Sequence, residues 1–252
     1  MENAYKNFFE AECRELADLE TFDPDAFVGD DAVPQSVCNF VLSLALIFND
    51  LRDLYYANFL VGGCKPTGSV LKNKQWGYYS GLYLHIVRLI LSAIHELLNL
   101  IEKQRADMDH PIFADVLKAL PKDKRKEWFD VVGIALGKSS ADSRLEKLLL
   151  RIRNNVSFHY DAKALYGGFR HHFLVHQPEE RAYVSRGNTV QSTRFYFADA
   201  AVDGLLNEIS GTNGPDLAAS FEKLIDGVYQ PVMLIISGFI QKRGCAFRQE
   251  PC

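Results

Sequence analysis

The sequence predicts an all-α protein, a bundle of long helices into which a small β-hairpin is inserted. Apolar residues recur at every third or fourth position through most of the 252 residues, which is the period of an amphipathic helix. Hydrophobic residues make up 48% and charged residues 24% of the chain, an ordinary globular composition. We therefore expect one domain over residues 1–252, with a core over about 34–172, a hairpin over about 181–197 and closing helices over 198–241.

Three helices are expected over about residues 3–107. The first covers about Asn3–Leu19, and a loop rich in Asp, Gly and Pro separates it from a long helix that follows Pro34. Gly62 and Gly63 end that helix, because glycine readily takes the conformations of a helix terminus. The third and longest helix covers about Gln75–Asp107.

A continuous polar stripe follows the longest helix. Its members are three or four residues apart, which keeps them on one face. They are His85, Arg88, Ser92, Glu96, Asn99 and Lys103. A solvent-facing surface explains the stripe, and so does the lining of a cleft, and the sequence leaves both interpretations open.

The rest of the chain continues with shorter helices and then the hairpin. Helices are expected after Pro111 and Pro121, then from Ser139 to about Phe158, and then from an Asp161 cap to about His172. Two short strands are expected next, at Ala182–Ser185 and Thr193–Phe197. Two helices follow at about Ala198–Ile209 and Asp216–Gln241, and Lys242–Cys252 is expected to be a loose tail. The last helix contains a proline, which is expected to kink it.

Charge is unevenly distributed along the chain, although the net charge is only −4. Residues 1–60 carry twelve acids and three bases, whereas residues 151–195 carry seven Lys or Arg, three acids and four histidines. The overall balance argues against a protein covered in basic surface, but the second segment suits an anionic partner. Unevenly solvated charge is the simpler explanation of the same counts.

Neither a secretory signal nor a membrane span is predicted. The N-terminus lacks the basic and apolar regions of a signal peptide. The apolar stretch Tyr78–Leu98 carries His85, Arg88, His95 and Glu96, which disfavours a bilayer span. The five cysteines are widely spaced without a Cys-x-x-Cys pair, which indicates free thiols in a reducing compartment. We therefore expect a cytoplasmic protein with no membrane partner.

Several familiar chemistries are disfavoured by the sequence. Gly133–Ser139 resembles a phosphate-binding loop, but the segment is one residue short and the chain lacks the strands that such a loop needs. We expect Gly137 to cap a helix instead. His171, His172 and His176 lie close together without a fourth metal ligand, so no metal and no cofactor are expected. A Ser-His-Asp hydrolase needs a Gly-x-Ser-x-Gly turn, which is missing. Cys-His catalysis stays open, because its partners need only meet in space.

The strongest candidate site is the segment Arg151–Asp161, which closes an amphipathic helix. Two arginines, two asparagines and a histidine fall within nine residues there, beside an apolar face. Arg151, Asn155 and His159 are four residues apart and share one face if the helix persists. Cations at a helix C-terminus also stabilise the helix dipole, which is a structural explanation of the same residues.

The run Arg153–His159 resembles the signature of the HEPN superfamily (higher eukaryotes and prokaryotes nucleotide-binding domains). That signature is an arginine, a polar residue directly after it, a spacer and a histidine, and Arg153, Asn154 and His159 fill these positions. In that superfamily the motif closes a late helix of an α-helical bundle, as expected here. The resemblance covers about residues 73–160, and the hairpin and closing helices lie outside the minimal family bundle, which leaves the subfamily open.

The resemblance implies a metal-independent endoribonuclease, because many HEPN proteins cleave RNA through its own 2′-hydroxyl group. It implies that His159 is the general acid or base, that Arg153 stabilises the phosphate and that Asn154 orients the reacting groups. Further residues would bind single-stranded RNA: Arg151, Asn155, Tyr160, Lys163, Arg170, His171 and His172. The resemblance also implies that the protein forms a homodimer. It implies a role as a toxin or an antiviral defence effector, which an antitoxin or another regulatory protein would bind.

Two other classes of function remain open. A HEPN-like module without catalysis would bind RNA, a nucleotide or a protein partner. A plain helical interaction protein would carry the motif by coincidence and present its acidic N-terminal helix to a partner. The placement of Arg153 and His159 discriminates among them. A shared cleft favours the nuclease, and a histidine buried in an apolar core favours the interaction protein.

Overall fold

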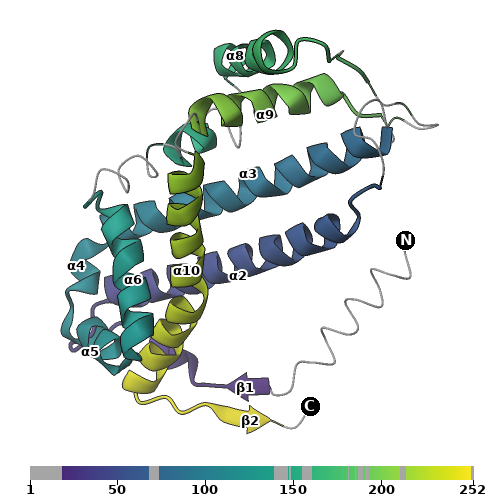
Figure 1. Ribbon diagram of the computed structural model, residues 1–252. Coiled ribbons are helices and arrows are strands. Elements are labelled where there is room, and N and C mark those ends of the chain that lie inside the picture. The colour runs from purple at the N-terminus through teal and green to yellow at the C-terminus, as the bar shows by residue number, and fades with distance from the viewer. Residues whose placement is uncertain are drawn as a thin grey trace.

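Long helices dominate the computed structural model, which confirms the all-α bundle predicted from the sequence (Figure 1). The structure describes residues 19–67, 74–138, 147, 149–154, 161–180, 182–184, 186, 190, 193–210 and 214–250, and the structural statements below concern these residues. α2 (Gln35–Gly63) and α3 (Lys74–Lys103) pack side by side, and α10 (Gly214–Lys242) packs against α2 and α6 (Lys122–Ala135).

The ends of these helices follow local sequence signals. α2 starts after Pro34 and ends at Gly63, as predicted. The long helix expected after it is interrupted at Gln104, between α3 and the single turn α4 (Arg105–Met108). Gly137 takes a left-handed conformation (φ 58°) after α6. The segment that resembles a phosphate loop therefore contains a helix terminus at Gly137, which confirms the predicted cap.

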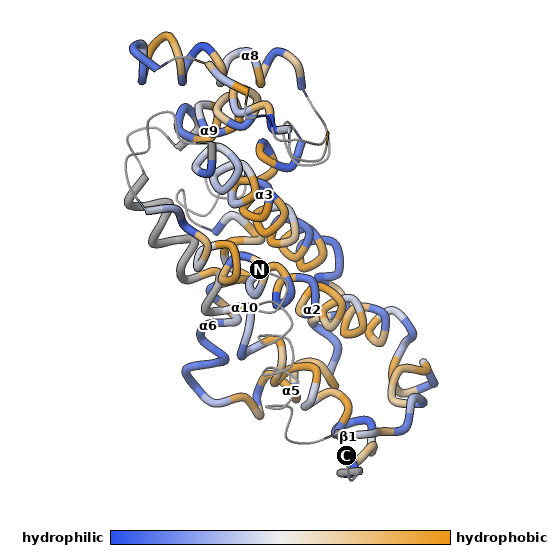
Figure 2. The backbone as a smooth tube through the Cα atoms, turned by 90° about the vertical axis from the view of Figure 1, so that its right-hand side faces the viewer, coloured by the Kyte–Doolittle hydropathy of each residue, from blue (hydrophilic) through white to orange (hydrophobic). Residues whose placement is uncertain are grey.

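The main core lies between α2, α3, α5 (Pro111–Ala119), α6 and α10. Its largest fully buried side chains include Phe40, Phe113 and Trp128. The ring of Phe113 contacts Phe40 and Trp128, with centroid distances of 5.3 and 6.3 Å. Figure 2 shows hydrophobic positions repeated along α2 and α3 and a hydrophilic start to α6. Burial of this apolar surface is the main stabilising contribution to the fold.

A second, smaller layer covers the bundle beside α3 (Figure 1). α9 (Tyr196–Ser210) packs against α3, against α8 (Ala162–Arg170) and against the π-helical segment η3 (His171–His176). Asp161 caps α8 as predicted, because its carboxylate accepts hydrogen bonds from two backbone N–H groups of the first turn at 2.8 and 2.9 Å. The second layer thus holds α8, η3 and α9 together on one side of α3.

The β-hairpin predicted over 181–197 is wrong for the residues that the structure describes. Ala182–Val184 are not in a strand, Arg194 forms an isolated bridge, and Tyr196 and Phe197 begin α9. The composition of this segment favours a strand locally, since it is rich in aromatic residues. Tertiary packing decides the outcome, as is usual for β-propensity, and α9 starts two residues earlier than expected.

The two ends of the described chain are joined by a short pair of strands. β1 (Leu19–Thr21) is antiparallel to β2 (Arg248–Glu250). The loose tail predicted over Lys242–Cys252 is therefore wrong for the part that includes β2. Of the first expected helix, Asn3–Leu19, only Leu19 is described, and it belongs to β1.

α3 is the one described helix that is long and apolar enough to cross a bilayer, by length and composition only. It packs against α2, α6 and α9 and buries Ile86, Ile94 and Leu97. Its polar stripe includes Arg88 and Glu96. Packing in the bundle covers part of the apolar surface of this helix, and Tyr78 and Tyr83 are exposed.

Candidate functional site

The segment that carries Arg153 is anchored by two buried side chains. Ile152 is 2% exposed and packs against Val202 and Leu205 of α9. Leu149, one turn earlier, is fully buried in the main core. These inward-facing residues fix the segment against the bundle and leave Arg153 partly exposed beside α3.

The guanidinium group of Arg153 is held by two contacts. Its Nε donates to Oε1 of Glu96 on α3 at 2.9 Å, and its Nη1 donates to Oδ1 of Asn154 at 3.1 Å. The side chains of Arg153 and Glu96 are 34% and 40% exposed. An ion pair this solvated contributes about 1 kcal/mol or less to stability. Its main consequence is that it orients the guanidinium group.

The polar stripe of α3 both lines a hollow and faces solvent. The hydroxyl of Ser92 is buried and donates to a backbone carbonyl one turn earlier at 2.8 Å. Ser92 and Glu96 line a hollow of about 400 Å³ together with Asp50 and Asp53 of α2. His85, nearer the start of α3, is exposed. Each of the two interpretations left open by the sequence therefore applies to a different part of the stripe.

Three members of the expected site, Asn155, His159 and Tyr160, lie outside the described residues. Arg151 and Asn154 are exposed on the described part of the same segment. The structure thus brings Arg153 and Asn154 together and adds Glu96, a partner that the sequence reasoning did not assign to the site.

The remaining expected RNA-binding residues divide into two groups. Lys163 and Arg170 of α8 are exposed, and the ring of His171 stacks on that of His176 with a centroid distance of 6.1 Å and an angle of 7° between the rings. His172, in contrast, is 3% exposed. The expectation that His172 contacts RNA is therefore wrong, because its ring is enclosed by side chains of η3 and α9.

His172 is the centre of a buried polar network. Its Nε2 lies 3.0 Å from Oε2 of Glu180, and its Nδ1 lies 3.5 Å from Oδ2 of Asp203, a distance that suits a charge pair better than a hydrogen bond. The hydroxyl of Tyr196 donates to Oε1 of Glu180 at 3.0 Å. The ring of Tyr183 stacks on that of Tyr196 at 4.2 Å. The network therefore ties η3 and the chain after it to α9.

The charges of this network follow from its geometry. Asp203 raises the pKa of His172 above its ordinary value of 6.5, and Glu180 raises it further, while burial opposes both. Burial raises the pKa of Tyr196, and the negative charge of Glu180 adds to this effect. Tyr196 therefore stays protonated and donates, and His172 favours its charged form.

Sequence reasoning missed Glu180, Asp203 and Tyr196 as partners of His172. Glu180 stands eight residues after His172, which is a helical spacing, but Pro178 argues against a continuous helix. The structure resolves this conflict with a turn, in which the Glu180 backbone N–H donates to the Gln177 carbonyl at 2.9 Å. The turn brings the Glu180 carboxylate back onto His172.

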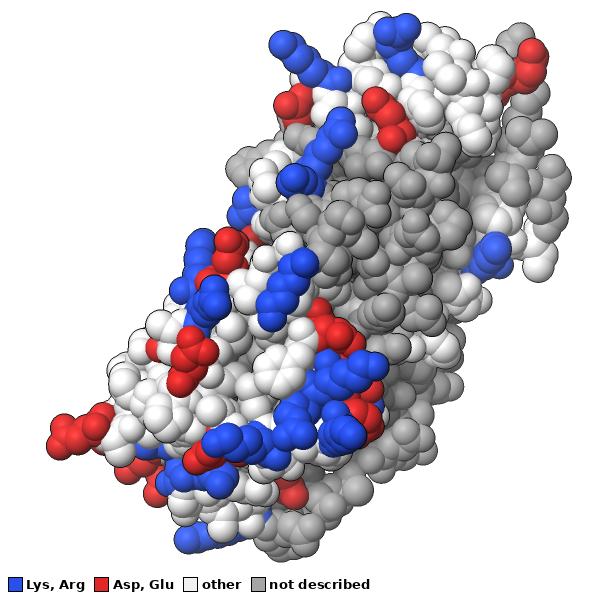
Figure 3. All heavy atoms as spheres, turned by 60° about the vertical axis from the view of Figure 1, so that its left-hand side comes forward, with Lys and Arg blue, Asp and Glu red and all other residues white. Residues whose placement is uncertain are grey.

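Basic side chains also gather at the start of α6, interleaved with acidic ones on the face shown in Figure 3. Lys122, Arg125 and Lys126 surround a shallow depression together with Asp123 and Asp130. Alternating charges of this kind suit a solvated surface better than a site for a polyanion.

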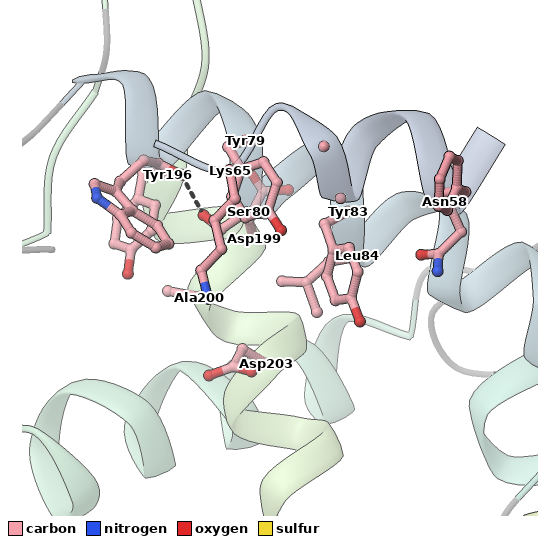
Figure 4. A pocket seen from close by; sticks show the side chains of 14 residues that line it. Asn58, Lys65, Tyr79, Ser80, Tyr83, Leu84, Tyr196, Asp199, Ala200 and Asp203 are labelled. Carbon is pink, nitrogen blue, oxygen red and sulfur yellow. Dashed lines mark hydrogen bonds between the residues drawn. The ribbon is translucent and has the colours of Figure 1, made fainter. Parts of the chain in front are cut away.

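An aromatic-lined pocket lies between α2, α3 and the start of α9 and has a volume of about 750 Å³. We call it the aromatic pocket. In Figure 4, Asp203 of α9 lies apart from Tyr79 and Tyr83 of α3, and Asn58 of α2 lies at one end. Its other walls include Phe59, Trp76, Tyr196 and Lys65. The sequence reasoning did not find this pocket, because its walls come from three separate segments.

Comparisons with protein-family models, curated proteins and solved structures found no match. Within the described ranges, no group of three or more His, Cys, Asp or Glu side chains is placed to hold a metal ion. Two places in the fold are therefore candidate sites, the surroundings of Arg153 and the aromatic pocket.

Proposed function

We propose that the protein is a metal-independent endoribonuclease of HEPN type, whose active site forms around Arg153 and His159. The observation that carries the proposal is the placement of Arg153 on a helical segment beside α3. Glu96 and Asn154 orient its guanidinium group there. A guanidinium has five N–H donors, and these two contacts use two of them. The remaining donors match the oxygens of a phosphate.

RNA supplies its own nucleophile in the proposed reaction. His159 takes the proton of the 2′-hydroxyl group, the 2′-oxygen attacks the adjacent phosphorus, and the bond from phosphorus to the 5′-oxygen breaks. A proton returns to the departing 5′-oxygen. Arg153 stabilises the negative charge that builds on the phosphate oxygens. The products are a 2′,3′-cyclic phosphate and a 5′-hydroxyl end.

The proposal includes a second copy of the chain. One histidine does not easily serve both as base on one side of the bond and as acid on the other. A two-fold symmetric homodimer would bring two motifs to one cleft. Exposed Arg151, Lys163 and Arg170 would then contribute positive charge to the RNA backbone. An antitoxin or another regulatory protein would restrain such an enzyme in the cytoplasm.

Cleavage of single-stranded RNA in excess chelator tests this function. We expect the wild-type chain to cleave, and His159→Ala to lose about 100-fold or more in rate because proton transfer is lost. Arg153→Ala is expected to lose a similar factor because charge stabilisation is lost. Product ends are identified by their chemistry, and circular dichroism confirms that each variant is folded.

Lys147→Ala is the matched control, because Lys147 is exposed on the same segment and has no role in the proposal. It should cleave like the wild-type chain. Equal rates for the wild-type chain and His159→Ala, or cleavage that needs a divalent metal, would contradict the proposal.

The alternative is a HEPN-like binding module without catalysis. The ion pair itself favours it, because Glu96 neutralises part of the charge that a phosphate would use. In that case RNA would bind without being cleaved, and Glu96→Gln would strengthen binding. The same cleavage assay separates the two functions.

A further inference from the structure

The aromatic pocket is separate from the surroundings of Arg153. Leu84, the wall residue of α3 nearest to Glu96 in the sequence, lies twelve positions before it, which is about 18 Å along a helix axis. Its volume of about 750 Å³ lies in the range of small-molecule sites. The pocket can therefore hold a ligand group that does not touch Arg153.

Flat rings form much of its wall. Tyr79 and Tyr83 are one helical turn apart, with a centroid distance of 6.0 Å and an angle of 20° between the rings. Trp76 meets Tyr79 edge to face at 5.7 Å. Phe59 and Tyr83 are 63% and 38% exposed. The exposed rings of Phe59 and Tyr83, with the half-buried ring of Tyr79, offer stacking surface to a planar ligand.

The carboxylates of the pocket are already paired. Asp199 accepts two hydrogen bonds from the guanidinium of Arg194, at 2.7 and 3.0 Å. Asp203 lies 3.5 Å from Nδ1 of His172 and accepts a hydrogen bond from Asn207 at 3.2 Å. Arg194 therefore neutralises Asp199, and an ammonium group in an aromatic cage would have to compete with His172 and Asn207 for Asp203.

Among the described residues that line the pocket, Lys65 supplies the one basic side chain. The ammonium of Lys65 lies over the ring of Trp76, 5.8 Å from its centroid, and no carboxylate in the described part of the chain pairs with it. An anionic group near the aromatic wall would complement this charge.

Two residues of the wall, Asn58 and Trp76, each carry a buried polar atom. Oδ1 of Asn58 and Nε1 of Trp76 are buried and have no hydrogen-bond partner among the described residues. One accepts and the other donates, and each would gain free energy if its side chain turned toward a ligand that supplies a partner. A planar ligand with polar edges therefore fits better than a purely apolar one.

We propose that the aromatic pocket binds one nucleotide unit, with its base stacked on Tyr79 and Tyr83 and its phosphate at Lys65. Asn58 and Trp76 contribute polar contacts at the walls. The inference rests on the proposed function, to which it adds a substrate-binding position remote from the cleaved bond. The nucleotide comes either from an RNA strand or from a free mononucleotide, and the two share the same chemistry.

Tryptophan fluorescence of the full wild-type chain tests the inference. The chain has two tryptophans, and Trp128 is fully buried in the main core, so a ligand in the pocket acts on Trp76. The ligands are AMP, adenosine and a short 2′-O-methylated oligoadenylate, which lacks the nucleophile and is not cleaved. We expect saturable quenching by AMP or by the oligonucleotide. If only the oligonucleotide binds, the ligand of the pocket is an RNA strand. If only AMP binds, the ligand is a free nucleotide.

Variants locate the two parts of the ligand. Tyr83→Ala is expected to raise the Kd about tenfold, because one stacking surface is lost. Lys65→Ala should weaken AMP several-fold and leave adenosine unchanged, because only AMP carries the phosphate. Phe129→Ala is the control, because Phe129 is an exposed aromatic residue of α6 outside the pocket, and it should bind like the wild-type chain.

Absence of quenching by AMP and by the oligonucleotide overturns the inference, as does an unchanged Kd in Tyr83→Ala. Saturable binding of tetramethylammonium without binding of either nucleotide ligand also overturns it, in favour of a cation site. These measurements involve no cleavage. A chain that binds AMP but cuts no RNA therefore disproves the nuclease alone, and a chain that cuts RNA without quenching disproves the pocket alone.

Discussion

Two side chains of this chain, Arg153 and His172, are held by carboxylates in different ways. Arg153 is 34% exposed and pairs with Glu96 in contact with water. His172 is 3% exposed and lies between Glu180 and Asp203. Rearranging a solvated ion pair costs little free energy, whereas breaking a buried pair costs much more because a charge is left without a partner. In the proposed function, Arg153 is therefore available to an incoming phosphate. His172 keeps its carboxylate partners in the folded protein and stabilises the fold.

His172 is expected to make stability depend on pH. Its pKa is raised in the folded state, so its stabilising contribution is complete below pH 6.5, the ordinary value, and is lost as pH rises through the folded value. We expect His172→Gln to lower the free energy of unfolding by about 2 kcal/mol at pH 6. The difference from the wild-type chain should shrink at higher pH.

Urea unfolding between pH 5.5 and 8.5 measures this effect. His171→Gln is the control, because it removes the neighbouring histidine without touching the network around His172. A deficit of His172→Gln that stays constant across this range would show that the charged form of His172 does not stabilise the fold.

The residue-scale features that the sequence predicts correctly are local. Asp161 caps α8 and Gly137 ends the turn after α6, because each acts on backbone groups a few residues away. Glu180 and Asp203 meet His172 only because the chain turns back and α9 packs on η3. Sequence spacing does not encode such a meeting, and the same is true of the pairing between Arg153 and Glu96.

At the scale of elements, the contact between α8 and α9 depends on two glycines. A Cβ atom on Gly204 would collide with the backbone carbonyl of Gly168 and lie 2.9 Å from Cβ of His172. A Cβ atom on Gly168 would collide with the Ala201 carbonyl and lie 2.8 Å from Cβ of Leu205. The two helices therefore approach more closely than side chains would allow, and this closeness positions His172 against α9.

Gly204→Ala is expected to destabilise the protein by about 1–3 kcal/mol through overpacking. This loss exceeds the gain of about 1 kcal/mol that alanine offers inside a helix, because the atom in the way belongs to the backbone. Thermal and urea unfolding of the variant measure the change in free energy of unfolding.

Gly133→Ala is the matched control for this substitution. Gly133 is also helical, but a Cβ atom there would meet only Cδ of Lys138 at 3.9 Å. We expect this variant to be as stable as the wild-type chain or slightly more stable. Equal stability of Gly204→Ala and Gly133→Ala would show that the α8–α9 contact relaxes freely.

Elements were predictable where one helical face is apolar over many turns, as in α2 and α3. The hairpin prediction was wrong because it depended on the local composition around Thr193–Phe197, and the packing of α9 overrides that local preference. The strand pair of β1 and β2 was not predictable, since its three-residue strands stand at opposite ends of the described chain.

At the scale of the whole molecule, the two ends of the described chain lie together at the end of the molecule remote from α8 and α9 (Figure 1). Arg243, just after α10, donates to the carbonyls of Ala26 and Val28 at 3.2 and 2.7 Å and pairs with Asp30 at 2.8 Å. These contacts and the strand pair fix both ends of the described chain to the large core. The second layer has a much smaller core, so a ligand or a second copy would affect its stability most.

The proposed nuclease should be a dimer whose activity depends on association. We expect light scattering to give twice the chain mass of 28.5 kDa. Activity per chain should fall on dilution into the range where the dimer dissociates, because each cleft then loses one of its two motifs. Arg153→Ala should keep the dimeric mass while losing activity, since its partly exposed side chain acts on the phosphate rather than on the core. A monomer whose activity per chain is independent of concentration would contradict the shared cleft and would require acid and base from a single copy.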